Sequence, residues 1–407
     1  MATLFYGWYI VIACFFISFY ISGAVVFSFT AFFEPIANEF GWSYTQISIA
    51  ASIRGLELGL FAPVMGFLVD RFGPRRLLLC GTFAIGAGCL LISQVQSLAM
   101  FYGAFVLLAL GLSACVGTVM PSAAANWFRM NVGKALGIIS AGIGAGGLLV
   151  PVVISLIDRF QWRTTYVFIG IGMWVIGLPL SCLIRRNPEQ YGYLPDGAQS
   201  KAHAAPSQAP DREKNYKQAL KSRAFWHLSL AEAIRLMALS ALITHVMPYL
   251  SSLGVPRTQA ALVTTAMTVF SIVGRLLFGW LGDIFNKYSV MALVYLLAGI
   301  SLLAFAHAQT TGFIFIFLIF FPLSWGAQPL RGAIIREYFG RLSFGSIVGL
   351  LSGIGTLARI IGPALAGWTF DAFGGYYFIW LAYAATFVLA VLLMLTIHPK
   401  AGKQVRR

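Results

Sequence analysis

Seven charged side chains of this 407-residue chain lie inside long apolar runs, where water would not surround them. A charge in such a place is costly, roughly 3 kcal/mol or more for an arginine at the centre of a bilayer, so it marks a candidate functional site. Guanidinium groups bind carboxylates through paired hydrogen bonds, and arginines in an apolar setting therefore predict recognition of an anion. The seven residues are Arg54, Glu57, Glu232, Arg235, Arg275, Arg331 and Arg359.

Arg275 and Arg359 are the leading candidates for substrate binding. Neither has an acidic residue within one helical turn on its own apolar run. Arg275 lies eight residues before Asp283, which corresponds to about 12 Å along a helix. Two unpaired arginines in one half of the chain predict a fixed positive site for an anion. The alternative for either residue is that it snorkels to the membrane surface or pairs with an acid on another helix.

The other acidic residues inside apolar runs are paired with arginines three positions away. Arg54 precedes Glu57, and Glu232 precedes Arg235, at a spacing that lets the side chains meet on one helix face. A structural ion pair is the favoured interpretation of both pairs. The functional alternative is gating or proton coupling, because a buried glutamate can hold its proton at higher pH.

A histidine and three aromatic residues are weaker candidates. His245 precedes Pro248 near the end of a run and could carry a proton, although a histidine satisfied by core contacts is the simpler interpretation. Tyr20, Phe27 and Trp325 could line a cavity around a small solute. For any single aromatic residue in a chain that is 15% aromatic, contact with lipid or core packing is the alternative.

The composition indicates that lipid is the solvent of most of the chain. It is 59% hydrophobic and 10% charged, whereas soluble domains have about 25% charged residues. The net charge of +15 does not indicate a nucleic-acid partner, because the basic residues lie between apolar runs of spanning length. The five cysteines lie in apolar stretches without C-x-x-C spacing, so neither a metal site nor another cofactor is expected.

A helix needs about 20 apolar residues to cross the hydrocarbon core of a membrane. Runs of that length predict an all-α membrane protein with twelve transmembrane helices. The expected helices cover residues 7–33, 44–69, 76–96, 99–125, 133–157, 163–185, 224–250, 258–282, 288–308, 311–335, 344–369 and 375–397.

One long polar stretch divides these helices into two sets of six. It contains four prolines, several charges and a run of Ala and Gln, as expected for a linker. We therefore predict an N-terminal six-helix bundle at 1–185, a cytoplasmic linker at 186–222, and a C-terminal six-helix bundle with a cytoplasmic tail at 223–407.

The distribution of lysine and arginine predicts the orientation. Twenty of them lie in the even-numbered loops and the C-terminal tail, whereas the odd-numbered loops hold only Arg159, Arg163 and Arg257. Because basic residues favour the cytoplasmic side, both termini are expected in the cytoplasm, and the chain in the cytoplasmic (inner) membrane.

The two halves repeat a short motif. Gly66 to Asp70 closes the second expected helix, and Gly279 to Asp283 closes the eighth, 213 residues later. Two parallel six-helix repeats suggest a transporter whose halves rock about a site near the membrane midplane. Asp70 could meet a helix N-terminus or a basic residue across the gap between the halves. We therefore expect Asp70, Arg71, Arg75 and Asp283 to form a conformational latch; the alternative is that these charges only set the topology.

The run from Gly66 to Arg76, GFLVDRFGPRR, resembles the loop signature of the major facilitator superfamily, G-x-L-a-D-r-x-G-r-r. The number of helices, the central linker and the weaker second copy fit the same family. The resemblance covers the whole chain. It implies two pseudo-symmetric bundles and transport of a solute by alternating access.

Within that superfamily, the chain resembles the monocarboxylate-transporter and oxalate/formate-antiporter branches. The similar segments include Tyr6–Trp8, Trp127–Arg129 followed by Gly133–Gly137, Arg186–Gly192 and Gly274–Gly279. The resemblance implies that Arg275 and Arg359 match the basic residues on helices 8 and 11 that bind substrate, and that Trp325 lies in an aromatic part of the site. The chain lacks the monocarboxylate branch's helix-1 lysine, since it has Val25 to Ser28 in that region. Ser271 replaces the aspartate one turn before the helix-8 arginine.

These observations predict a secondary transporter of a small mono- or dicarboxylate, working by anion exchange or by proton symport. The alternative is an exporter of a drug-like or other amphiphilic solute by proton antiport, although two unpaired arginines argue against a cationic drug. Without a metal cluster, nucleophile elbow or paired carboxylates, an enzyme is not expected. A receptor without transport activity would lack a signalling domain. The expected partners are the carboxylate, the lipid bilayer and, in the symport case, protons, and we expect a monomer.

Overall fold

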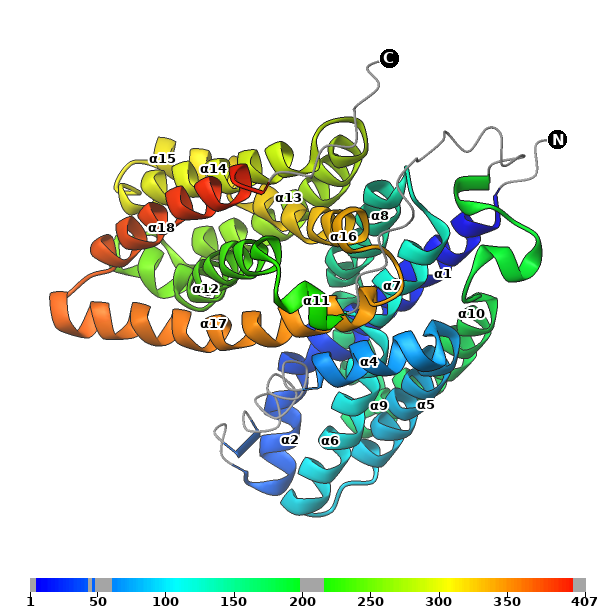
Figure 1. Cartoon of the computed structure of the whole chain (residues 1–407). Coiled ribbons are helices and arrows are strands. Elements are labelled where there is room, and N and C mark those ends of the chain that lie inside the picture. Colours follow the sequence, from blue (N-terminus) through cyan, green and yellow to red (C-terminus); the bar gives the residue numbers. More distant parts are fainter. Residues whose placement is uncertain (1–4, 43–45, 48–60, 198–215, 398–407) are drawn as a thin grey trace. The chain divides into compact units, whose positions relative to one another are not determined.

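The computed structural model describes residues 5–42, 46–47, 61–197 and 216–397. Every regular element in these ranges is helical (Figure 1). The predicted all-α membrane architecture is confirmed. The contacts between residues divide the chain into two compact units, with the boundary between them falling inside two of the helices, α8 and α17.

The first unit comprises residues 1–129, 138–201 and 343–353. Helices α5 and α6 lie side by side within it (Figure 1). Its elements are α1 (Tyr6–Tyr20), η1 (Ile21–Phe27), η2 (Ser28–Phe32), α2 (Phe33–Phe40), α4 (Ala62–Phe72), α5 (Pro74–Ser93), α6 (Leu98–Cys115), α7 (Val119–Trp127), most of α8 (Val132–Ala145), η3 (Gly146–Leu149), α9 (Val150–Gly172), η4 (Met173–Gly177), α10 (Leu178–Leu183), η5 (Pro188–Tyr191), η6 (Pro195–Gly197) and the start of α17 (Phe344–Phe373).

The second unit comprises residues 130–137, 202–342 and 354–407. Within it, α14 lies along α18 (Figure 1). Its elements are the first turns of α8, α11 (Tyr216–Leu220), α12 (Arg223–Ser252), α13 (Arg257–Ile284), α14 (Lys287–Ala306), α15 (Thr311–Phe320), η7 (Pro322–Gly326), α16 (Ala327–Phe339), the remainder of α17, and α18 (Tyr377–Leu395). The predicted domain boundaries at 185 and 223 stay a prediction.

Ten helical stretches among the described residues are long and apolar enough to cross a membrane. One of them, 132–183, holds both the fifth and the sixth predicted helices, and Gln161 interrupts it with a φ of 66°. The second predicted helix is described only at its end, as α4, because much of 44–69 lies outside the described residues. The remaining predicted helices begin and end within a few residues of observed ones.

Two predicted helices are interrupted near the middle. The expected helix at 99–125 breaks at Gly117, whose φ of 90° favours glycine, and gives α6 and α7. The expected helix at 311–335 passes through the short segment η7, which begins with Pro322, before it continues as α16. Because proline cannot donate a backbone hydrogen bond, it accounts for the second interruption.

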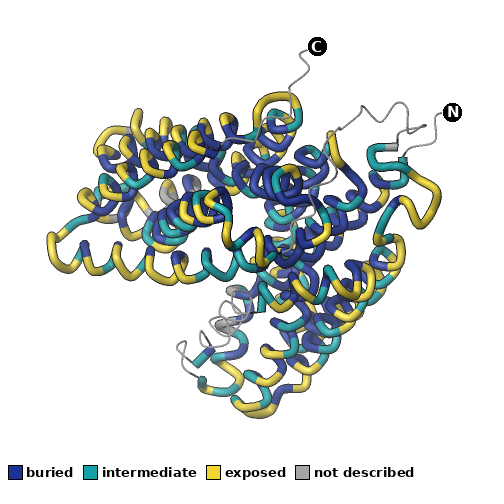
Figure 2. The backbone as a smooth tube through the Cα atoms, in the orientation of Figure 1, coloured by how far each residue is buried: buried dark blue, intermediate teal, exposed yellow. Residues whose placement is uncertain are grey.

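Figure 2 shows exposed residues along the helices of both units. Many of the exposed residues are large and apolar. Examples are Leu148, Val175, Leu357 and Val388, each more than half exposed. A soluble protein rarely presents so much apolar surface. The pattern is that of helices whose outer faces contact lipid.

Candidate anion-binding site

A buried ion pair lies on α12. Glu232 and Arg235 are 1% and 4% exposed, respectively. Arg235 donates two hydrogen bonds to Glu232, from Nε to Oε2 at 2.8 Å and from Nη2 to Oε1 at 2.7 Å. A bidentate geometry of this kind fixes both side chains. The i,i+3 spacing on one helix therefore places the carboxylate and the guanidinium together.

Two residues from other helices complete the surroundings of Glu232. Arg331, on α16, donates from Nη1 to Oε1 at 3.2 Å. Tyr295, on α14, donates its hydroxyl to Oε2 at 3.3 Å. In the sequence, Arg331 stands out as a charge inside an apolar run, but its partner is not predicted. No sequence pattern predicts a polar contact for Tyr295. Both lie 63 or more positions from Glu232, so only the packing of the helices brings them there.

Arg275 lies buried on α13, with 5% of its surface exposed. Its Nη1 donates to the hydroxyl of Ser271, one turn earlier, at 3.1 Å. Its Nε is buried and has no hydrogen-bond partner among the described residues. No acidic group of the described chain forms an ion pair with it. Electrostatic repulsion from Arg235 reaches Arg275, so it belongs to the same charged region.

Arg359 comes to the same region from α17. A Cβ atom added to Gly355 would contact the side chain of Leu236, and one added to Gly362 would contact the carbonyl oxygen of Met237. Arg359 is four residues after the first glycine and three before the second, so it lies on the face of α17 that packs against α12. Arg359 itself is exposed, and it forms no ion pair within the described ranges. Arg235, Glu232 and Arg331 all act on it electrostatically.

These five charged residues form one positive cluster. We define the arginine cluster as Glu232, Arg235, Arg275, Arg331 and Arg359. It holds four guanidinium groups and one carboxylate, so its net charge is +3. Arg275 is buried without a counter-ion among the described residues, which is costly, so the cluster favours an anionic ligand. No group of three or more His, Cys, Asp or Glu residues that could hold a metal occurs in the described chain.

Trp325 lies close to the segment that carries Arg275. Its neighbour Gly326 packs so tightly on α13 that an added Cβ would meet the carbonyl oxygen of Gly274, the residue before Arg275. The Trp325 ring is half-buried and meets Phe321 edge-on, with ring centroids 6.1 Å apart. Its predicted contact with substrate stays a prediction.

His245, on α12, is held by two hydrogen bonds. Its Nε2 lies 3.1 Å from the carbonyl oxygen of Pro363, and its Nδ1 lies 3.1 Å from the Tyr376 hydroxyl. A carbonyl oxygen can only accept, so Nε2 must carry a hydrogen, and Nδ1 of the neutral ring then accepts from Tyr376. A neutral His245 therefore has a partner on each nitrogen.

The two remaining aromatic candidates lie in the first unit. Tyr20, on α1, donates its hydroxyl to the carbonyl oxygen of Ile169 at 3.0 Å. Phe27, at the end of η1, is 39% exposed. Their role in binding stays a prediction. Arg54 and Glu57 lie outside the described residues.

Asp70, at the end of α4, contacts the start of α17 within the first unit. Its carboxylate accepts hydrogen bonds from the backbone N–H groups of Gly345 at 3.0 Å and Ser346 at 2.8 Å, and from the Ser346 hydroxyl at 2.6 Å. Arg186 donates to the backbone carbonyl of Asp70 at 2.6 Å. No contact is predicted from the sequence for Arg186, which lies among the basic residues of the linker.

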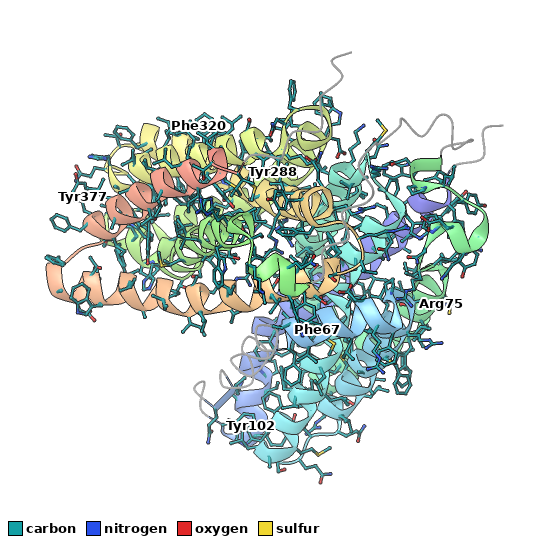
Figure 3. All side chains as sticks on the ribbon, viewed as in Figure 1. Phe67, Arg75, Tyr102, Tyr288, Phe320 and Tyr377 are labelled. Atoms are coloured by element: carbon teal, nitrogen blue, oxygen red, sulfur yellow. The ribbon has the colours of Figure 1, made fainter. Side chains whose placement is uncertain are left out.

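Asp283, at the end of α13, makes the equivalent contact in the second unit. Its two carboxylate oxygens accept hydrogen bonds from the backbone N–H groups of Gly133 and Lys134, each at 2.7 Å, at the start of α8. Arg71 and Arg75, in contrast, are exposed, and Arg75 lies in the first turn of α5 (Figure 3). The structure thus gives both aspartates a helix N-terminus as partner. Arg71 lies over the Phe72 ring, 5.5 Å from its centroid, and the place of both arginines in a latch stays a prediction.

Comparison with known proteins places these features in a family context. The model of the Major Facilitator Superfamily matches residues 10–320 and 241–407. Monocarboxylate transporter 12 of Mus musculus is 26% identical over 395 residues, covering 91% of this chain and 81% of that protein. The oxalate:formate antiporter of Oxalobacter formigenes is 24% identical over 391 residues, covering 95% and 90%. The solved structure of the proton:xylose symporter XylE has a similar fold, with a TM-score of 0.76 at 17% identity, covering 97% of this chain and 96% of that one.

Proposed function

Because the chain belongs to the Major Facilitator Superfamily, it is a membrane transporter and not an enzyme, and we propose that its substrate is a small carboxylate anion. Arg275 and Arg359 bind the carboxylate, and alternating access moves it across the membrane. One observation carries the proposal: two guanidinium groups of the arginine cluster have no carboxylate partner in the described chain. Guanidinium and carboxylate groups match in charge and in hydrogen-bond geometry.

The relatives support this class of substrate. A monocarboxylate transporter and an oxalate:formate antiporter both align with more than nine-tenths of this chain. Arg275 and Arg359 lie on α13 and α17, which correspond to the eighth and eleventh predicted helices.

Of the two modes of coupling, the surroundings of the arginines favour anion exchange. Ser271, the hydrogen-bond partner of Arg275, cannot gain a negative charge near neutral pH. Glu232 is occupied by two arginines, so it is poorly placed to take up a proton on each cycle. His245 remains the candidate for proton coupling, because its ring nitrogens contact the Tyr376 hydroxyl and the Pro363 carbonyl oxygen rather than a fixed counter-ion.

The test is uptake of labelled carboxylates into proteoliposomes that contain the purified chain. Lactate, pyruvate, formate, oxalate and succinate would each be tested with and without the same acid inside the vesicle, and with and without an inward proton gradient. Uptake that requires internal carboxylate supports exchange, whereas uptake that rises with the proton gradient alone supports symport. Absence of uptake for every acid, together with transport of an amphiphilic cation, would replace the proposal with the exporter alternative.

We also propose that the transporter functions as a monomer in the cytoplasmic membrane, with both termini in the cytoplasm. The twenty-to-three distribution of basic residues supports the orientation. Labelling of single cysteines introduced into a cysteine-free variant, at the exposed positions 38 and 75, would test it. The first should react with a membrane-impermeant thiol reagent in intact cells, and the second only after lysis.

A further inference from the structure

Glu232 is surrounded by two cations, since Arg235 and Arg331 both form ion pairs with its carboxylate. Oε1 accepts from Arg235 and Arg331, and Oε2 accepts from Arg235 and Tyr295. A carboxylate has about four acceptor positions, and all four are used. Such a carboxylate is held ionised, and it has no position left for a proton or for a bound cation.

The same contacts divide the arginine cluster into two parts. Arg235 and Arg331 share Glu232 as their counter-ion, with N–O distances of 2.7 and 3.2 Å. Arg275 and Arg359 form no ion pair within the described ranges, whereas a buried Nε without a hydrogen-bond partner occurs in both Arg275 and Arg331. An anion that entered the cluster would therefore meet two guanidinium groups without a counter-ion and two that share Glu232.

We propose that Glu232 is a built-in counter-anion that determines how many negative charges the bound substrate carries. This inference rests on the proposed function, since it concerns the selectivity of the same site. With Glu232 ionised, the cluster has a net charge of +3, and each negative charge on the substrate reduces it by one. Removal of the Glu232 charge raises the net charge to +4 and shifts selectivity towards anions that carry one more charge.

The physical reason is the cost of uncompensated charge close to the ligand. Close charge pairs in protein interfaces are strongly coupled, and the coupling of some pairs changes affinity by more than tenfold. Consider two anions that differ by one charge. One additional positive charge close to the ligand should change the ratio of their affinities about tenfold or more.

The experiment measures binding of three acids on the same two-carbon core to the purified full-length chain at pH 7.5. Propionate, succinate and ethane-1,1,2-tricarboxylate differ mainly in the number of carboxylates. Isothermal titration calorimetry would give the dissociation constant of each acid for the wild type and for Glu232→Gln. We expect the affinity ratio of the tricarboxylate to succinate, and of succinate to propionate, to rise about tenfold in the variant.

Matched variants separate charge from structure. Arg331→Gln lowers the net charge to +2, and the ratios should move in the opposite direction. The double variant Glu232→Gln/Arg331→Gln restores +3, so its ratios should return to those of the wild type. It also removes one of the two arginines that Glu232→Gln leaves without a counter-ion, which helps if the single variant does not fold. Tyr295→Phe removes a hydrogen bond without changing any charge and should leave the ratios unchanged. Glu337→Gln, which removes the partner of Lys287 outside the cluster, should leave both ratios and affinities unchanged.

The outcomes distinguish this inference from the proposed function. If the wild type binds none of the three acids, the carboxylate proposal fails. If the acids bind but Glu232→Gln has the same ratios as the wild type, the counter-anion inference fails while the carboxylate proposal stands. If the affinity ratios shift equally in Glu232→Gln and in the double variant, Glu232 acts by holding the structure of the site and not by its charge. That result would also overturn the inference.

Discussion

The hydroxyl of Ser346 lies 2.6 Å from the carboxylate of Asp70 and donates a hydrogen bond to it, while the backbone N–H of the same serine donates to the same oxygen at 2.8 Å. The first backbone N–H groups of any helix lack partners within the helix. At the start of α17 an aspartate from α4 supplies the acceptor, and the positive end of the helix dipole favours its charge.

The first prediction concerns this contact. If the bonds from Gly345 and Ser346 hold one state of the transport cycle, Asp70→Asn should lower the rate of transport by about 5- to 30-fold, for a loss of about 1–2 kcal/mol. Substrate affinity should change less than about twofold. Initial rates of uptake and equilibrium binding, measured on the same preparation, would check this.

The control for Asp70→Asn is Asp158→Asn, which alters an exposed aspartate of α9. It should leave both the rate and the affinity unchanged. Asp283→Asn should behave like Asp70→Asn, because Asp283 occupies the equivalent position at the start of α8. An Asp70→Asn variant with wild-type turnover would exclude the latch.

The second prediction concerns the close helix contacts beside the two aspartates. A Cβ atom added to Gly66 would overlap the carbonyl oxygen of Gly345, and one added to Gly279 would overlap that of Gly133. Backbone cannot yield as a flexible side chain can, so Gly66→Ala and Gly279→Ala should each destabilise the protein by about 1–3 kcal/mol.

Gly103→Ala is the matched control, since nothing lies within 4 Å of an added Cβ at that position of α6. Alanine is the better helix former, and the control should be neutral or stabilising by up to about 1 kcal/mol. Thermal denaturation in detergent would rank the three variants. Equal melting temperatures for all of them would contradict the packing argument.

The features that the sequence can predict are those with a short or regular spacing. The apolar runs predict the helices, the i,i+3 spacing predicts that Glu232 and Arg235 face one another, and the 213-residue repeat indicates that Asp70 and Asp283 are equivalent. Each of these depends on helix geometry alone.

The features that the sequence does not reveal depend on which helices pack together. Nothing in the pattern around Tyr295 indicates a bond to Glu232, 63 positions earlier. Arg331 is visible as a costly charge, but its partner is 99 positions away and lies on another helix. Arg186 resembles a topology-setting charge, although it is bonded to the backbone of Asp70.

The third prediction tests the substrate site directly. Arg275→Gln removes one free guanidinium and should weaken carboxylate binding by about 2–5 kcal/mol, which is about 30-fold or more. Arg275→Lys keeps the charge but loses the paired geometry, so its loss should be intermediate.

The protein should fold in both variants, because Arg275 is not the counter-ion of any acid in the described chain. Circular dichroism and size-exclusion profiles would establish that. Arg76→Gln, which alters an exposed arginine of α5, serves as the control with unchanged binding. Wild-type affinity in Arg275→Gln would remove this residue from the site.

The fourth prediction is a dependence of stability on pH in the first unit. Hydrogen bonds from Arg163 hold the pKa of Glu39 below its usual value, and a bond from the Trp162 indole contributes. Arg163 also donates to the carbonyl oxygens of Ser93 and Val95, so the pair joins α2, the end of α5 and α9.

Because the pKa of Glu39 is lowered by folding, its contribution is complete above the usual glutamate pKa and is lost as the pH falls through the lowered value. The pair is partly exposed, and solvent screening limits its contribution to about 1 kcal/mol or less. Melting temperatures between pH 7 and pH 3 should fall less steeply for Glu39→Gln than for the wild type. Parallel curves would show that this pair does not contribute.

The partners of Asp70 also set an order of events during synthesis. Ser346 follows Asp70 by 276 positions, and a ribosome that adds about 5–20 residues per second needs about 14–55 s to reach it. For that interval the nascent chain carries the Asp70 carboxylate without the three donors that it has in the finished protein. The Asp70 carboxylate therefore acquires its native donors only after most of the chain has been synthesised, and a product truncated before residue 343 would never acquire them.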